Sequence, residues 1–339
     1  MVTVGMLSHR KDPRTVFKSY AYAAAAKMEG VGFYFFSPGR VKFTDRSIDG
    51  WIYENGQWIQ KSMPFPDVIY NASPPQTDKQ EDVVARLSEM IPFTSHSIGD
   101  KLDVYYKIKD AKVFAQYLIP SIELTRSQDV FEFLRQYESI VMKPLIGHKG
   151  QNIYFVERNK ETYNVQLNKT TTVALNEKEF EDFISSQIIN NTYLAQVFVE
   201  SKTKNGLSTH FRLHTQKGGE GEWNLTTIYP CMAQQGIVAN ISSGGYTMLF
   251  ENFLKQEFDD EYYNIKRYLE QFAIHFTKHF DRLYHNILDE LGIDVGLDKN
   301  HKIWIFEVNW RPGSPPTFSL ELDVAKQMIR YARYLAENR

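Results

Sequence analysis

Apolar positions near the start of the chain form short runs on either side of one helical pattern. Residues 3–8 predict a buried strand, residues 13–29 a helix with an early proline, and residues 32–38 a second strand. This strand–helix–strand order favours a parallel α/β sheet. The loop 71–76 (NASPPQ) follows a later strand, at the end of the sheet where open α/β folds tend to bind ligands.

The pattern changes twice in the rest of the chain. Helical spacing predicts helices over residues 100–118 and 127–137, and Ser127 is the expected N-cap of the second helix. The pattern after them predicts first strands with period-two alternation and then long antiparallel strands. A hairpin turn is predicted at Asn55-Gly56. Further helices are expected over residues 78–90, 177–188, 262–291 and 318–336, the third of them ended by Gly292.

The composition is that of a globular protein with little net charge. In 339 residues, 39 Lys and Arg face 41 Asp and Glu, so the net charge is −2. A basic field over the whole protein, as expected for gripping nucleic acid, is therefore absent. The single cysteine, Cys231, excludes an internal disulfide framework and a cysteine-based zinc cluster. Without a secretory signal pattern or an apolar stretch of ~20 residues, we expect a cytoplasmic protein with no membrane span.

The strongest candidate for chemistry lies in two predicted strands near the C-terminus, IDVGL and KIWIFEVNW. Alternation places Ile303, Ile305, Glu307 and Asn309 on one face, and Trp304, Phe306, Val308 and Trp310 on the other. A two-residue turn at Asn300-His301 would put Asp294 directly opposite Glu307. A divalent cation would relieve the repulsion between these carboxylates, and an all-oxygen set with Asn309 favours Mg²⁺. The alternatives are a strand end that exposes Glu307 and Asn309 to water, or a register that separates the carboxylates.

A second candidate is the segment SIVMKPLIGHKGQNIYFV. Its strand delivers Lys143, and the following loop contains Gly147, Lys149 and Gly150. Glycines let backbone N–H groups approach a polyphosphate. The spacing of a Walker A loop is absent, and no helix follows. A simple glycine-containing turn would produce the same pattern.

Together these segments resemble a known fold. A strand lysine, a glycine-rich β-turn-β and a distal Asp…Glu-x-Asn on paired strands resemble the ATP-grasp fold. The segments KPLIGHKGQNIYFV, HFRLHTQKGGEGEWNLTTIYPCMAQQGIVANISSGG and ELGIDVGLDKNHKIWIFEVNWRPG are similar to the YheC/YheD family of endospore coat-associated ATP-grasp proteins. The resemblance implies an α/β (α+β) ATP-grasp fold. Its expected parts are a leading N-terminal α/β domain (1–95), a nucleotide-binding subdomain (96–195) and a C-terminal subdomain with the metal site (196–339).

The resemblance also implies roles for individual residues. The nucleotide-binding set is Lys101, Lys143, Gly147, Lys149, Gly150, Gln196, Val197, Phe198 and Glu200. In this set Lys143 matches the lysine that contacts the α-phosphate and adenine. Residues 196–198 match the hinge strand whose backbone contacts the adenine edge, and Glu200 matches a residue that contacts the ribose. Lys101 has the alternative of an exposed helical lysine. Arg212 and Asn240 match residues at the transferred phosphate, and the loop with Arg311 is where a substrate carboxylate would be met. The implied Mg²⁺ (or Mn²⁺) ligands are Asp294, Glu307 and Asn309.

Two positions depart from the family pattern. His210 stands where an aspartate is usual, and Cys231 where a phosphate-facing arginine is expected. Losing a guanidinium removes a charge-assisted contact, which would weaken phosphoryl transfer more than nucleotide binding. For Cys231 itself, a covalent role and a small buried side chain are the two alternatives.

The resemblance implies an ATP- and Mg²⁺-dependent ligase that joins a small-molecule carboxylate to an amine or thiol through an acylphosphate. The alternative is a spore-associated structural or regulatory protein that binds nucleotide but has lost turnover, which His210 and Cys231 support. A spore-coat association of the otherwise cytoplasmic protein follows from the same resemblance. A nucleic-acid binder is disfavoured because no basic cluster with interleaved aromatics is present.

Overall fold

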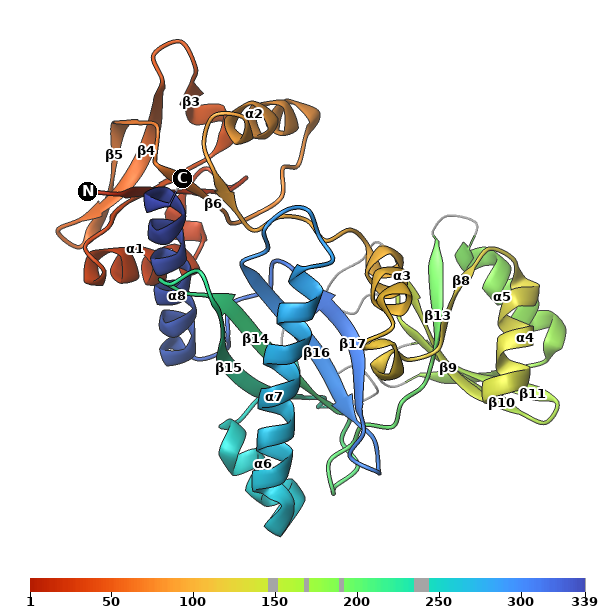
Figure 1. Ribbon diagram of the computed structural model, residues 1–339. Helices are drawn as coiled ribbons and strands as arrows, with labels where there is room; N and C mark the ends of the chain where they lie inside the picture. The colour runs from red at the N-terminus through yellow and green to blue at the C-terminus, as the bar shows by residue number, and fades with distance from the viewer. Residues whose placement is uncertain (146–151, 168–170, 189–191, 235–243, 339) are drawn as a thin grey trace.

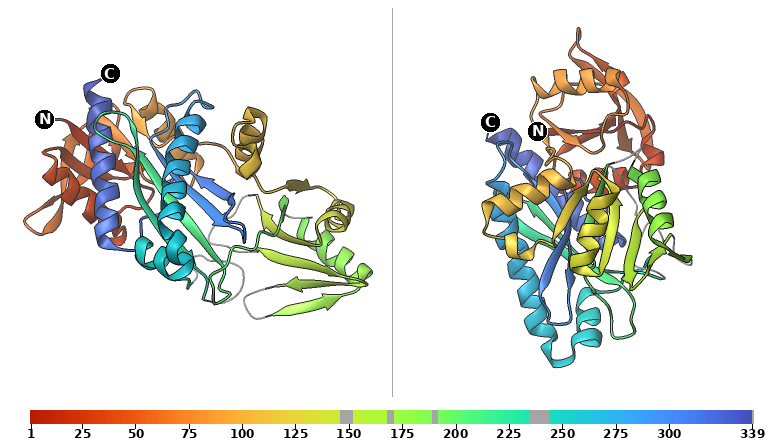
Figure 2. Two further views of the ribbon diagram at one scale, coloured as in Figure 1. Left: turned by 60° about the horizontal axis from the view of Figure 1, so that its bottom comes forward. Right: turned by 90° about the vertical axis from the view of Figure 1, so that its right-hand side faces the viewer.

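The described part of the chain contains three β-sheets (Figure 1). The structure is a computed structural model, and it describes every residue except 146–151, 168–170, 189–191, 235–243 and 339. Both termini lie beside the first sheet, and the third sheet lies between the first and the second (Figures 1 and 2). No helix in the described ranges is long and apolar enough to cross a membrane.

The first sheet contains the predicted parallel strands. Its order is β3 (Val41–Lys42), β4 (Ser47–Glu54), β2 (Gly32–Phe36), β1 (Thr3–Leu7), β6 (Val68–Asn71) and β7 (Phe93–Thr94), with β5 (Gln57–Pro64) paired to β4. Strands β2, β1, β6 and β7 are parallel. The predicted hairpin turn is confirmed, since Asn55 and Gly56 both have positive φ. The first predicted helix is shorter than expected: a 3₁₀ turn at Pro13–Thr15 precedes α1 (Lys18–Met28). Helix α2 (Asp78–Ser88) follows β6.

The second sheet is antiparallel and carries two helices that pack against each other. Its order is β12 (Thr172–Leu175), β11 (Thr162–Gln166), β10 (Tyr154–Asn159), β9 (Ser139–Pro144), β13 (Tyr193–Val197) and β8 (Ser121–Leu124). Helices α4 (Ser127–Tyr137) and α5 (Glu177–Ile188) close its core. The expected N-cap was wrong by one residue: Arg126 is the cap, and its N–H donates to the Asp129 carboxylate.

The third sheet is built from long antiparallel strands, as predicted. Its order is β15 (Trp223–Met232), β14 (Thr209–Lys217), β16 (Glu290–Leu297) and β17 (Ile303–Asn309). Its core is shared with α3 (Lys101–Ala111), α6 (Phe250–Phe258) and α7 (Tyr262–Asp281). The predicted helix over 100–118 ends at Ala111, and a 3₁₀ turn at Ala115–Tyr117 follows.

The predicted helix over 262–291, ended by Gly292, was wrong. Helix α7 ends at Asp281, and Glu290, Leu291 and Gly292 belong to β16. The side chain of Asp281 accepts the Leu288 N–H, which fixes the connection between the helix and the strand. Strand β16 pairs with a neighbour on each side and every one of its residues is buried. An apolar run buried on both faces has the same sequence signature in a strand as in a buried helix.

The last helix, α8 (Phe318–Glu337), returns to the first sheet (Figures 1 and 2). Ala325, Met328, Ile329 and Ala332 pack in one core with α1, β1 and β6. Another part of α8 faces the third sheet, where the Val324 carbonyl accepts a hydrogen bond from the Gln216 side chain. The helix therefore joins the first and third sheets. The domain limits expected from the sequence stay predictions.

Candidate active site

One face of the third sheet is polar because β14 alternates. Phe211 and Leu213 point into the helix-covered core, so Arg212 points to the opposite face. The strand registers place Arg212 opposite Asp294, and Asp294 opposite Glu307. Three charged side chains from three strands therefore form one row across the sheet.

The predicted pairing of Asp294 with Glu307 is confirmed, but the predicted face was wrong. The register between β16 and β17 shifts between Asp294 and Val295, which leaves Phe306 as an extra residue in β17. This β-bulge turns Glu307 and Asn309 away from Ile303 and Ile305, and Val308 joins the core instead. Bulges are common beside active sites, where they re-aim side chains. Here the bulge puts both polar residues on the face of Asp294.

The hairpin turn that precedes the bulge also differs from the prediction. The chain reverses over Asp298–Lys302, with the Asp298 N–H donating to the Lys302 carbonyl and with His301 at positive φ. This loop is one residue longer than the predicted turn at Asn300-His301. The extra residue at Phe306 compensates for that difference, so Asp294 still faces Glu307.

Arg212 and Asp294 form a two-pronged ion pair. Arg212 Nε lies 2.5 Å from Asp294 Oδ1, and Nη2 lies 2.9 Å from Oδ2. Burial alone would raise the pKa of Asp294, but the charge and hydrogen bonds of Arg212, with smaller contributions from His210 and Lys143, hold that pKa below its ordinary value. Burial would likewise lower the pKa of Arg212, and the Asp294 charge raises it instead. Both groups are therefore ionised at neutral pH.

Two lysines approach this row from the second sheet and from α3. Lys143 Nζ donates to Gln196 Oε1 at 3.0 Å and to the Phe306 carbonyl at 3.2 Å. Lys101 Nζ donates to the Leu145 carbonyl at 3.0 Å and lies 3.7 Å from Glu307 Oε1. Burial lowers the pKa of Lys143 to about 8, and the Lys101 charge adds to that effect. Lys143 therefore holds its proton weakly and would gain from an anion nearby.

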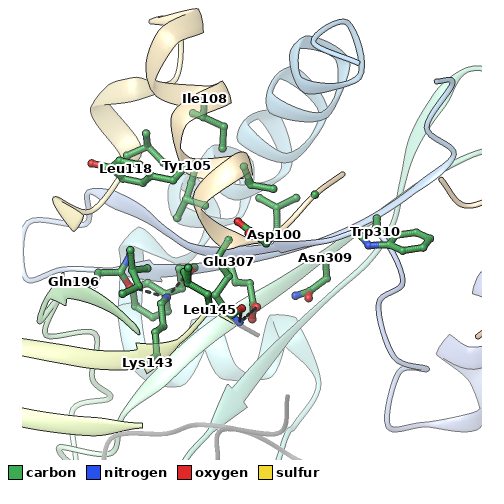
Figure 3. A pocket seen from close by; sticks show the side chains of 17 residues that line it. Asp100, Tyr105, Ile108, Leu118, Lys143, Leu145, Gln196, Glu307, Asn309 and Trp310 are labelled. Carbon is green, nitrogen blue, oxygen red and sulfur yellow. Dashed lines mark hydrogen bonds and ion pairs between the residues drawn. The ribbon is translucent and has the colours of Figure 1, made fainter. Parts of the chain in front are cut away.

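A pocket of about 300 Å³ lies between the second and third sheets, next to α3. Lys101, Lys143, Gln196, Glu307 and Asn309 line it, so these five predicted residues are brought together. Figure 3 shows Gln196 and Leu118 at one end and Asn309 and Trp310 at the other. The pocket therefore runs from a mostly apolar end to an end with acidic and amide oxygens.

The apolar lining was missed by sequence reasoning. It consists of Val104, Tyr105, Ile108, Leu118, Leu145, Leu194, Ile305 and Phe306. The segment with Leu118 reaches the pocket because Leu118 forms a parallel bridge with Ile305 of β17. The sequence contains no signal that separates such residues from ordinary core positions, since Leu118 and Ile305 are 187 positions apart.

The structure does not place the other predicted nucleotide-binding residues in the pocket lining that it describes. Val197 and Phe198 do not line the pocket, and their N–H groups donate to the Pro120 and Ser139 carbonyls. Glu200 is exposed and pairs with Lys202. Four predicted residues fall outside the described ranges: Gly147, Lys149, Gly150 and Asn240. For all of them the assigned roles stay predictions.

The two departures from the family pattern lie together beside the Arg212–Asp294 pair. Strand β14 places His210 opposite Cys231 on β15, and His210 Nε2 lies 3.7 Å from Asp294 Oδ1. Burial raises the pKa of Cys231 to about 12, helped by the Asp294 charge. The thiol is thus protonated at neutral pH, which argues against a covalent role.

The donor set fits a hard divalent cation. Asp294 and Glu307 face each other on paired strands, and Asn309 Nδ2 lies 3.4 Å from Asp294 Oδ2. Arg212 and the Asn309 amide together use three of the roughly four acceptor positions of the Asp294 carboxylate and leave one. Among the described residues no group of three His, Cys, Asp or Glu side chains is placed so that it could hold a metal ion. The predicted set of two carboxylates and one amide is therefore oxygen-rich and suits Mg²⁺ better than zinc.

Comparisons with known proteins identify a matching family and two relatives. Residues 90–335 match the family described as "YheC/D like ATP-grasp". Endospore coat-associated protein YheC of Bacillus subtilis (strain 168) is 24% identical over 335 residues, covering 92% of this chain and 89% of that protein. Endospore coat-associated protein YheD of the same strain is 26% identical over 324 residues, covering 89% and 70%.

Solved structures share the fold at low sequence identity. D-alanyl-alanine synthetase A from Vibrio cholerae O1 biovar eltor str. N16961 has a TM-score of 0.60 at 12% identity, covering 100% of this chain and 99% of that chain. N5-carboxyaminoimidazole synthetase from Staphylococcus aureus, complexed with ADP, has a TM-score of 0.55 at 13% identity, covering 98% and 77%. These likenesses show a common ATP-grasp architecture.

Proposed function

Because the chain belongs to the YheC/D-like ATP-grasp family, we propose that it is an ATP- and Mg²⁺-dependent ligase. It joins a small-molecule carboxylate to an amine or thiol through an acylphosphate. One observation carries the proposal: the pocket combines an apolar end with an end where Lys101, Lys143 and Glu307 meet the Arg212–Asp294 pair.

The charges around this end suit a polyphosphate that arrives with its metal ion. Lys101, Lys143 and Arg212 supply three cations, and Asp294 and Glu307 supply two carboxylates. The cations attract phosphate oxygens, and the carboxylates with Asn309 would hold Mg²⁺. In the absence of nucleotide the two carboxylates offset two of the three cations. When nucleotide and metal bind, phosphate oxygens would replace the carboxylates as partners of the cations, and Mg²⁺ would replace the cations as the partner of the carboxylates.

Each part of the pocket has a proposed task. Leu118, Leu145 and Leu194 give the adenine ring an apolar surface. The Gln196 side chain lies at the same end of the pocket as Leu118 (Figure 3). Lys143, held by Gln196 and the Phe306 carbonyl, fixes the first phosphates. Bound Mg²⁺ neutralises charge on the phosphates.

Arg212 stabilises the negative charge that develops during transfer. A substrate carboxylate oxygen attacks the γ-phosphorus and ADP leaves. The amine or thiol then attacks the acyl carbon, loses its proton, and inorganic phosphate leaves.

Nucleotide titrations with and without Mg²⁺ test the proposal, together with ADP release across a panel of carboxylic acids and amino acids. The variant Glu307→Gln should retain the fold, lose most of the metal dependence of ATP binding, and lose turnover. Glu157→Gln, at an exposed glutamate on β10, is the matched control. Equal metal dependence in wild type and Glu307→Gln would remove Glu307 from the metal site. Absence of ATP binding in the wild type would overturn the proposal.

A second candidate is a nucleotide-binding protein of the spore with weakened catalysis. His210 and Cys231 favour it, because they stand beside Arg212 where the family pattern has a charged residue. The two relatives described as endospore coat-associated suggest the same location. Tight ATP binding without ADP release for any acid in the panel would favour this candidate. Substrate-dependent ADP release would favour the ligase, acting in the cytoplasm of the cell or the spore.

A further inference from the structure

A buried hydrogen-bonded contact ties the segment before α3 to the third sheet. This segment, residues 95–100, connects β7 of the first sheet to α3. The Ser95 N–H donates to Asp289 Oδ1 at 2.6 Å, and Ser95 Oγ donates to Asp289 Oδ2 at 3.4 Å. Asp289 directly precedes β16, and the two residues are only 1% and 3% exposed. The contact therefore joins, inside the protein, two parts of the chain that lie 194 residues apart.

The same contact positions one wall of the nucleotide pocket. Helix α3 follows the segment and supplies four residues of the pocket lining, Lys101, Val104, Tyr105 and Ile108. Two further hydrogen bonds fix this part of the chain to the connection between α7 and β16. The Tyr284 hydroxyl donates to the Ile98 carbonyl at 3.0 Å, and Lys107 Nζ donates to the Leu283 carbonyl at 3.3 Å. The position of α3 against the third sheet therefore depends on a few polar contacts, and the contact to Asp289 is the one with a buried carboxyl group.

Asp289 has no positively charged partner in the part of the chain that the structure describes. No Lys, Arg or His nitrogen there lies within 4.0 Å of its carboxylate oxygens. Lys217 of β14 instead pairs with Asp281 of α7 at 2.8 Å. The next residue, Glu290, is also buried, and its carboxylate lies 2.8 Å from His214 Nε2. Two adjacent buried carboxyl groups without a shared cation are costly to ionise together.

A proton on Asp289 removes this cost and keeps the contact. Burial raises the pKa of Asp289 to about 7, and the Glu290 charge adds to that effect, against the Ser95 hydrogen bonds and the Lys217 charge. In the protonated form Oδ1 still accepts the Ser95 N–H, and the Oδ2 proton can be donated to Ser95 Oγ. In the ionised form the same contact buries a charge next to Glu290. The contact is therefore stronger when Asp289 carries its proton.

Three other titratable groups lie around this contact. Burial raises the pKa of Tyr70 on β6 and that of Tyr331 on α8, so both phenols keep their protons at neutral pH. Burial lowers the pKa of His96, the residue after Ser95, below 6.5. His96 therefore gains a proton only in acid, and a variant of Asp289 is needed to separate the two titrations.

We propose that the contact between Ser95 and Asp289 is a proton-dependent clamp that holds α3, and with it one wall of the nucleotide pocket, against the third sheet. The inference rests on the ligase function proposed above and specifies how its nucleotide site is regulated. When the clamp opens, water reaches Asp289 and the carboxyl group returns to its ordinary acidity. The open form therefore binds the proton less tightly than the closed form, so a rising pH favours opening. The opening constant should rise by up to about tenfold per pH unit between about pH 4 and 7 and stay nearly level above.

Amide hydrogen exchange in the free protein tests the clamp directly. Exchange of a peptide that covers residues 95–105 is followed by mass spectrometry from pH 5 to 8 and corrected for the intrinsic rate. The protection of this peptide in the wild type should fall roughly tenfold or more between pH 5 and 7, and much less between pH 7 and 8. Asp289→Asn keeps an acceptor for the Ser95 N–H and a donor for Ser95 Oγ, so its protection should change little with pH. Asp110→Asn, at an exposed carboxylate on α3, is the matched control and should follow the wild type.

Thermal melting separates a clamp from an ordinary structural contact. At pH 8 Asp289→Asn should melt at or above the temperature of the wild type, because it no longer buries a charge. At pH 5 the two proteins should melt at similar temperatures. Equal pH dependence of exchange in the wild type and Asp289→Asn, or none in the wild type, would overturn the proposal. Strongly lowered melting temperatures of Asp289→Asn at both pH values would overturn it as well, since the carboxylate would then be a fixed structural acceptor.

Nucleotide binding tests the link between the clamp and the pocket. Mg²⁺·ADP, with predicted contacts to Lys101 of α3 and Asp294 of β16, should slow the exchange of residues 95–105 at pH 8 in the wild type and in Asp289→Asn. Nucleotide that binds without slowing this exchange would show that the clamp does not act on the pocket, and would contradict the inference. A failed ligase proposal would appear separately, as absence of Mg²⁺·ATP binding to a protein whose exchange still depends on Asp289.

Discussion

Replacing Lys143 with methionine removes a buried ammonium group that donates to Gln196 Oε1 and to the Phe306 carbonyl. Burial lowers the pKa of Lys143 from 10.5 to about 8. The Glu307 charge opposes this shift, and the Lys101 charge adds to it. That difference corresponds to about 3 kcal/mol by which folding disfavours the charged form. Methionine relieves this cost but leaves two acceptors without a donor, at about 1 kcal/mol each. We expect little net change in the free energy of unfolding at pH 7.

The wild-type protein should show two opposite pH dependences from this one group. Below pH 8 Lys143 is charged in the folded and unfolded states, so the free protein bears the full cost of burial. Between pH 8 and 10.5 the folded state releases its proton first, and the stability of the free protein rises. A bound triphosphate favours the charged lysine. ATP affinity should therefore be level up to about pH 8 and fall above it, by at most tenfold per pH unit.

Calorimetric titration of Mg²⁺·ATP between pH 7 and 9.5 measures this profile. Lys143→Met should bind ATP roughly tenfold or more weakly at pH 7 and show no decline at higher pH. Lys255→Met, at an exposed lysine paired with Glu251, is the control and should follow the wild type. The pKa of His210 is lowered by burial and that of Cys231 is raised to about 12, so neither obscures this range. A wild-type affinity that stays level to pH 9.5, or an equal decline in the variant, would refute the reasoning.

Three further changes probe the row across the third sheet. Asp294→Asn removes the counter-charge of the Arg212 guanidinium, which is only 17% exposed, and should lower the free energy of unfolding in urea by about 3–5 kcal/mol. Glu307→Gln, at a half-exposed side chain, should lower it much less, and equal losses in the two variants would contradict this reasoning. Cys231→Arg puts a second guanidinium beside Arg212 at a position that is 5% exposed, so this variant should have a much lower melting temperature than Cys231→Ala. An unchanged melting temperature together with tighter ATP binding would show instead that the new arginine contacts a phosphate. Gly296→Ala would push a methyl group into the ring of Phe306 and should weaken nucleotide binding. Gly39→Ala, whose methyl group would meet no atom within 4 Å, is the control and should bind nucleotide as the wild type does. Equal affinities of the two variants in a titration would show that the position of Phe306 in the bulge does not affect the pocket.

The pairing of Asp294 with Glu307 could be predicted from the sequence, but its face could not. Period-two alternation assumes one residue per pleat, and Phe306 breaks that rule. Nearly every residue of IWIFEVNW is apolar, so the sequence does not mark which one is extra. The correct pairing followed from an assumed turn that was too short by one residue, and the bulge cancelled that error.

The pocket as a whole could be predicted only in its charged part. Lys143 and Glu307 stood out because an ionisable residue on a buried strand needs a reason, whereas Lys101 was implied only by the family resemblance. Leu118, Leu145 and Leu194 did not stand out, because a leucine in a pocket and a leucine in a core have the same local pattern.

The return of α8 to the first sheet has a consequence for how the protein is made. Strands β1 and β6 and helix α1 are translated well before α8, but four of the apolar residues in their shared core, including Met328 and Ile329, belong to α8. Until then the first sheet has an uncovered apolar surface that is open to chaperones and to other nascent chains. Truncating the chain before α8 should therefore expose the oldest part of the protein. Synthesis of α8 therefore completes a core whose other parts were translated much earlier.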